Sequence, residues 1–144
     1  MNITFTKLDR QRHALELRRA DGSIERTVLE SAVFFLHDLT HYVVERLLKY
    51  ERGFWGMLAA GHALADLSGK ANPLTNELRF IEKIVGPVQS AYMGHFPPNF
   101  VPTAIAHLDY SLPDRFAELA LERLRALERE WTALPFGGQL KLEW

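Results

Sequence analysis

The sequence contains no cysteine among its 144 residues. This absence excludes disulfide frameworks, thiolate zinc sites and cysteine nucleophiles, and it agrees with a reducing cytoplasm. The sequence also has no excess of charge of either sign, because it contains 17 basic and 18 acidic residues and its net charge is −1. A chain without a basic field has no electrostatic drive toward nucleic acids. We therefore expect no nucleic-acid partner.

Long hydrophobic runs are absent too, and an apolar segment such as 32–36 falls far short of the ~20 residues that a membrane span needs. The first residues lack the charged-then-apolar pattern of a signal peptide. We expect a cytoplasmic protein that does not bind a membrane. The sequence also lacks a Gly-x-Gly-x-x-Gly motif, a Gly-Lys-Ser/Thr loop and a Gly-x-Ser-x-Gly elbow. These absences argue against nucleotide-dependent enzymes and serine hydrolases.

The composition is that of one globular domain over residues 1–144, with 47% hydrophobic and 24% charged residues. Alternating polar and apolar residues at both ends of the chain predict strands. Asp21-Gly22 separates two of these runs and is a hairpin signal. We expect Leu142 and Trp144 to lie on the buried face, near Ile3 or Phe5. The predicted strands cover residues 2–8, 13–19, 24–29 and 139–144.

Longer segments between the strands predict helices over 31–50, 54–67, 75–93 and 113–134. Ser31 is a candidate N-cap, and Gly53 separates the first two helices. The third is expected to break or kink at Gly86-Pro87, because proline removes a backbone donor. Strands, then helices, then one returning strand predict an α+β fold. We expect a four-stranded antiparallel sheet packed on four to five helices.

Two histidines mark the predicted helix over 31–50. His37 and His41 are four residues apart, which places them on one helix face about 6 Å apart along the axis. They lie at the border of the apolar stripe, beside the carboxylates of Asp38 and Glu45. Two imidazoles at this spacing can share one metal ion. Burying them without a ligand or a hydrogen bond would cost free energy.

The segment His37-Asp38-x-x-His41 resembles the His-Glu-x-x-His helix of the zincin metallohydrolases, with Asp in place of Glu. The resemblance implies two histidine ligands to zinc and an acidic residue that activates water. Zincins of the gluzincin type add a third ligand on a downstream helix. His62 follows His41 after 20 intervening residues and forms an i,i+4 pair with Asp66. The expected metal ligands are His37, His41, His62 and Asp66.

The expected chemistry follows from these donors. Nitrogen and oxygen ligands without sulfur suit zinc, or iron or manganese where carboxylates dominate. An open coordination position would hold water and lower its pKa toward ~7. Asp38 or Glu45 would then be the catalytic base. The substrate, a small molecule or a peptide, is not specified by any motif.

A second resemblance covers His37–Glu45 together with Gly53-Phe54-Trp55-Gly56 and Ala59-Ala60-Gly61. These segments are similar to those of a family of small uncharacterised bacterial proteins. The resemblance implies a bacterial origin and no particular activity.

The sequence leaves open whether the protein is an enzyme. One hypothesis is a metal-binding, hydrolase-like protein. The alternative is a non-catalytic interaction or small-ligand-binding domain in which the histidines are structural and pair with Asp38, Glu45 or the backbone. Asp66 would then pair with Lys70 at the surface. Phe54 and Trp55 would be core anchors if buried and a homo-oligomer interface if exposed.

Overall fold

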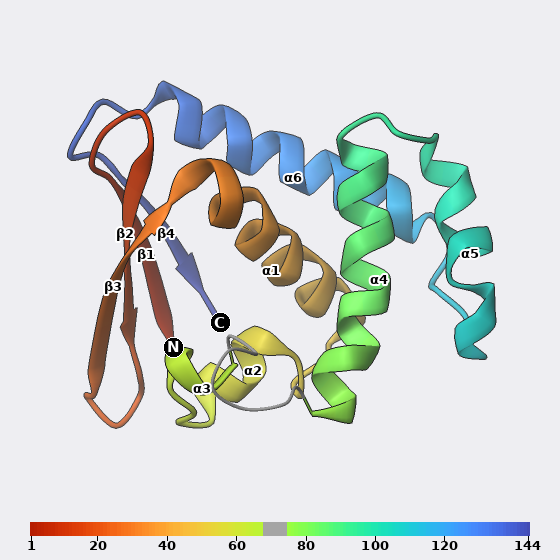
Figure 1. Cartoon of the computed structure of the whole chain (residues 1–144), viewed down its shortest axis with the longest axis horizontal. Helices are drawn as coiled ribbons and strands as arrows, with labels where there is room; N and C mark the ends of the chain where they lie inside the picture. The colour runs from red at the N-terminus through yellow and green to blue at the C-terminus, as the bar shows by residue number, and fades with distance from the viewer. Residues whose placement is uncertain (68–74) are drawn as a thin grey trace.

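Four antiparallel strands form a sheet at one side of the molecule, and the helices cover one of its faces (Figure 1). The computed structural model describes residues 1–67 and 75–144. The strands are β1 (Asn2–Lys7), β2 (Arg12–Arg18), β3 (Ile24–Glu30) and β4 (Gln139–Glu143). The helices are α1 (Leu36–Leu48), α2 (Phe54–Ala59), α3 (Leu64–Leu67), α4 (Asn76–Tyr92), α5 (Val101–Ala104) and α6 (Phe116–Ala133). Short turns are η1 (Ser31–Phe35), η2 (Pro98–Phe100) and η3 (Ala106–Leu108). The α+β prediction is confirmed.

The strand order β3-β2-β1-β4 places the last strand beside the first. Leu142 of β4 pairs with Ile3, and Leu140 pairs with Phe5. Ile3, Phe5 and Leu140 are fully buried. Trp144 is half-buried against the core. The alternation of apolar residues therefore selects the register, since a slip by one residue would turn these side chains to the other face.

Helix α1 lies between the sheet and α4, and α6 runs beside α1 from the sheet to α4 (Figure 1). Its buried apolar side chains include Leu39, Val43 and Val44. The indole of Trp55 is fully buried and donates from Nε1 to the backbone oxygen of Asp38 at 3.0 Å. These contacts join α1 to α2 within the core. Within the described ranges, no helix is long and apolar enough to cross a membrane.

The ends of the first predicted helix differ from the expectation. The helical segment begins with the π-helical turn η1, and the Ser31 side chain caps nothing. Its hydroxyl instead lies 3.1 Å from Nδ1 of His13. The segment ends at Lys49, which takes a left-handed conformation with φ 52°. Gly53 is the N-cap residue of α2 and does not end α1.

The second predicted helix, over 54–67, is divided in the structure. Helix α2 ends at Ala59, and α3 begins at Leu64. Gly61 lies between them with φ 105°, a conformation that glycine adopts at little cost. By contrast, α4 passes through Gly86-Pro87 without a break.

His13 is a buried, uncharged histidine on the inner face of the sheet. It is 0% exposed, and its Nε2 has no hydrogen-bond partner in residues 1–67 and 75–144. The rings of Phe5, Phe35 and Trp131 surround it at centroid distances of 5.6, 5.5 and 6.2 Å. Burial in this apolar setting lowers the pKa of His13 to about 4 from an ordinary 6.5.

The lowered pKa of His13 predicts a pH-dependent loss of stability. Between pH 6.5 and about 4 the unfolded chain binds a proton that folded His13 does not. Neutral His13 therefore makes its full contribution to the free energy of unfolding above pH 6.5. That contribution decreases as the pH falls toward 4. The loss should be roughly 3 kcal/mol. Urea unfolding of the native protein and of His13→Leu across this range measures it, and parallel curves for the two proteins would contradict it.

Candidate metal centre

Two helices bring three metal-ligating side chains together. His37 and His41 lie one turn apart on α1, with ring centroids 4.6 Å apart. Glu82 comes from α4, which packs against α1. One ligand atom from each of these three residues lies within 4.8 Å of the others. The group is therefore compact enough to hold one metal ion.

The two imidazoles are oriented by their far nitrogens. Nδ1 of His41 lies 2.9 Å from Oε1 of Glu45, and Nδ1 of His37 lies 3.1 Å from Oε1 of Gln89. The near nitrogens converge on one atom, because Nε2 of His41 and Nε2 of His37 lie 3.1 and 3.8 Å from Oε1 of Glu82. Histidine ligands typically use one ring nitrogen for the metal and bond the other to an oxygen. This structure has that arrangement at both rings.

Glu45 is buried behind His41, and its carboxylate is fully hydrogen-bonded. Its side chain is 0% exposed. Oε1 accepts from His41 Nδ1 and from the backbone N–H of Phe54, and Oε2 accepts from the backbone N–H of Trp55. Three donors thus occupy the carboxylate and hold it away from any substrate. Glu45 thus positions His41 and the start of α2 in this structure.

The charges of the site are coupled. Burial alone would lower the pKa of His41, but its hydrogen bonds to Glu45 and Glu82 outweigh burial and raise that pKa to about 9. Burial acts to raise the pKa of Glu82, yet hydrogen bonds from His37 and His41 hold it well below its usual range. Without a metal, a protonated His41 therefore lies between two carboxylates. A metal ion would take the place of the proton that His41 directs at Glu82.

Asp38 is the second buried carboxylate of α1, with 6% of its surface exposed. Burial raises the pKa of Asp38 to about 7, against the opposing charges of His37 and His41. Its carboxylate makes no hydrogen bond to the described part of the chain. It faces a pocket of about 500 Å³ that His37, His41 and Glu82 also line. Asp38 therefore borders the same space as the three ligand groups.

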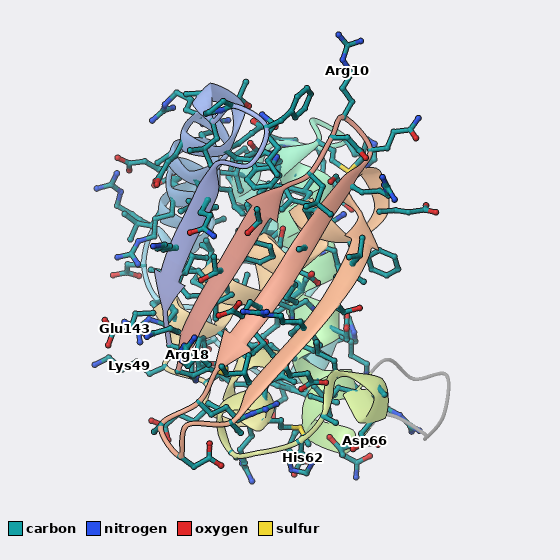
Figure 2. The ribbon with its side chains drawn as sticks, turned by 90° about the vertical axis from the view of Figure 1, so that its left-hand side faces the viewer. Arg10, Arg18, Lys49, His62, Asp66 and Glu143 are labelled. Carbon is teal, nitrogen blue, oxygen red and sulfur yellow. The ribbon has the colours of Figure 1, made fainter. Side chains whose placement is uncertain are left out.

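His62 and Asp66 do not join the metal-ligating group. Both side chains are exposed, and they lie at the end of the molecule where α2 and α3 meet the sheet (Figure 2). The expectation that they complete the site assumed one straight helix over 54–67. The chain turns at Gly61, and the structure does not bring His62 and Asp66 together with His37, His41 and Glu82. Lys70, the expected partner of Asp66, lies outside the described residues.

Phe54 and Trp55 are mainly core residues. Trp55 is fully buried, and Phe54 is half-buried with its ring 5.6 Å from that of His41. Trp55 consequently offers no surface to a second copy, as expected for the core alternative.

Glu82 is the member of this candidate metal-binding group that sequence reasoning missed. It lies beside the apolar face of α4, one residue after the buried Ile81. Gln89 follows two turns later on the same side of the helix. The sequence thus contains a polar pair on one helix face, but only the packing of α4 on α1 shows what that pair contacts.

Comparisons with protein-family models, with curated proteins and with solved structures find no match.

The position of Glu45 predicts an unusual sensitivity at Gly53. A Cβ atom at Gly53 would lie only 2.3 Å from the Glu45 carboxyl carbon, and that carboxylate is held by three hydrogen bonds. We expect Gly53→Ala to lower the free energy of unfolding by about 1–3 kcal/mol. The matched control is Gly86→Ala on α4, where a Cβ meets nothing within 4 Å and helix propensity should add about 0.5–1 kcal/mol. Equal urea midpoints for the two variants would contradict the close approach.

Proposed function

We propose that the chain binds one zinc ion through His37, His41 and Glu82 and hydrolyses a substrate in the adjoining pocket. The observation that carries the proposal is the convergence of both Nε2 atoms on Oε1 of Glu82 while both Nδ1 atoms are held from behind. Such an arrangement fixes the tautomer of each ring with its near nitrogen directed at a metal. The aspartate in the zincin-like segment supports the same proposal.

The donor set supports a hydrolytic rather than a structural site. Two imidazole nitrogens and one carboxylate oxygen are a ligand set of hydrolytic zinc enzymes, whereas closed structural sites use four protein ligands. Three protein ligands leave one position open. A bound zinc ion would supply a Lewis acid there and would lower the pKa of coordinated water toward ~7.

Asp38 supplies the proton transfer in this proposal. Its carboxylate borders the pocket and is not occupied by a donor from residues 1–67 or 75–144. Hydrolysis consumes one water: its oxygen bonds to the electrophilic atom of the substrate as Asp38 takes the proton. The bond to the leaving group then breaks, and Asp38 returns the proton to that group. Glu45 and Gln89 keep the imidazoles in place throughout.

A non-catalytic role is the second candidate, and one observation favours it. His41 is hydrogen-bonded at both ring nitrogens without a metal, so its burial needs no ion. The pocket would then bind a small ligand beside a structural ion pair. Metal content separates the two candidates.

The first prediction from the proposal concerns metal content. Protein purified without an affinity tag should contain close to one zinc per chain by elemental analysis, and His37→Ala/His41→Ala should contain almost none. The matched control is His62→Ala/His107→Ala, which removes two exposed histidines and should keep the metal. If the native protein takes up no zinc, iron or manganese after incubation, the structural role of His37 and His41 is the correct one.

The second prediction concerns Asp38. Asp38→Asn keeps the size of the side chain but removes the base, so the zinc content should stay unchanged. Hydrolysis of p-nitrophenyl acetate should fall about 10²–10⁴-fold, the usual contribution of a general base. Asp66→Asn is the control on an exposed carboxylate and should hydrolyse the ester at the native rate. An Asp38→Asn protein with full activity would exclude Asp38 as the base.

A further inference from the structure

Strand β3 is an edge of the sheet and also a wall of the pocket at the candidate metal centre. It pairs with β2 on one side, and no described strand pairs with its other side. Arg26, Thr27 and Leu29 of β3 line the same pocket as His37 and Glu82. An open strand edge therefore lies alongside the proposed metal site.

The hydrogen bonds at the two ends of the β2–β3 pair show which backbone groups face outward. Arg19 N–H donates to the Ser23 oxygen at 3.0 Å, and Ser31 N–H donates to the Gln11 oxygen at 2.7 Å. Both pairs fit the same antiparallel register. Bonded and non-bonded pairs alternate along such a ladder. Every second residue of β3 between these two ends therefore bonds to β2, beginning with residue 25.

Arg26 and Val28 are consequently the central residues whose N–H and C=O groups point away from β2. Their side chains lie on the outer face of the sheet, where Arg26 forms an ion pair with Glu16 at 2.6 Å and Val28 is 56% exposed. The side chains of Thr27 and Leu29 lie on the inner face, toward the pocket. The open edge thus presents main-chain donors and acceptors at the mouth of the pocket.

We propose that this pocket takes an extended peptide segment, which pairs with Arg26 and Val28 of β3 and turns alternate side chains toward His37 and Glu82. Unpaired strand groups repeat every second residue, a spacing that another extended polypeptide matches. A space of about 500 Å³ admits a few side chains of one segment rather than a folded partner. Cleavage of the peptide rests on the proposed function, whereas binding of the peptide does not.

The geometry also specifies the side chains of that peptide. Residues directly opposite Arg26 and Val28 share their face and point to solvent, while the residues between them point into the pocket. Phe54, Leu29 and Leu64 give the pocket apolar walls. Bulky apolar residues at every second position should therefore bind best, with polar residues between them.

The test uses the full chain and the blocked heptapeptide acetyl-Lys-Leu-Thr-Leu-Thr-Leu-Lys-amide at millimolar concentration. Hydrogen exchange resolved by residue should slow at the Arg26 and Val28 amides when the peptide is added. The Thr27 and Leu29 amides already bond to β2, so they are internal controls whose exchange should not change. Absence of peptide-dependent protection at Arg26 and Val28 overturns the proposal.

Methylated peptides test the pairing itself. One peptide carries N-methyl groups on both threonines, and the other carries them on the leucines. If the peptide pairs antiparallel to β3, methylation should weaken binding of the first peptide about tenfold or more and leave binding of the second unchanged. Parallel pairing should give the reverse, and either pattern supports the proposal. Equal affinity of both methylated peptides and the parent overturns it.

Variants of β3 provide a second measurement. Val28→Pro removes an outward N–H, which an edge strand tolerates, and should weaken the parent peptide about fivefold or more. Val28→Ala keeps the N–H and should bind as the native chain does. If Val28→Pro does not fold, the methylated peptides still decide. Protection that rises with protein concentration in the absence of peptide identifies a second copy as the occupant and overturns the proposal.

The outcome is independent of the metal. Removal of zinc with EDTA should leave the peptide-dependent protection at Arg26 and Val28 in place. If the native protein binds no zinc but the peptide still protects Arg26 and Val28, only the proposed hydrolysis is refuted. Zinc bound without any protection would refute only the peptide.

Discussion

The buried carboxylate of Glu45 joins α1 to the start of α2, and the rest of the site depends on this connection. It lies on α1, receives the imidazole of His41 from the same helix, and accepts two backbone N–H groups from the start of α2. A buried charge of this kind is tolerated only when donors satisfy it. Those donors fix the ring of His41 and the path of the chain after Gly53. The close approach at Gly53 follows from the same constraint.

Two buried histidines of this protein show that surroundings, and not burial alone, set the charge of a side chain. His13 lies among aromatic rings with one hydroxyl partner, and burial lowers its pKa to about 4. His41 is as deeply buried, but its contacts with Glu45 and Glu82 raise its pKa to about 9. The sheet face is thus an apolar environment, and the α1–α4 interface is a polar one. Among the described residues, the group that could hold a metal ion lies at the second.

The parts of the fold that the sequence predicts are those that local pattern determines. Leu140 and Leu142 alternate with polar residues, which was enough to predict the returning strand, and the i,i+4 spacing was enough to place His37 beside His41. Glu82 could not be predicted as a ligand because its role depends on the contact between α4 and α1. The break between α2 and α3 could have been expected, since a glycine commonly follows the end of a helix and Gly61 does so here.

The hairpin between β2 and β3 attaches the sheet edge to the region of α2 and α3. Arg19 bonds to Glu25 at 2.7 Å and to the backbone oxygens of Leu58 and His62, and Glu25 accepts from Leu64 N–H at 2.9 Å. These contacts attach the first half of β3 to the region of α2 and α3, so the pocket is bounded at that end. The second half of β3 is not tied in this way by the described residues. An extended chain would therefore meet the open edge beside Val28. The Arg19–Glu25 ion pair lies at the other end of the strand, where Glu25 also lines the pocket.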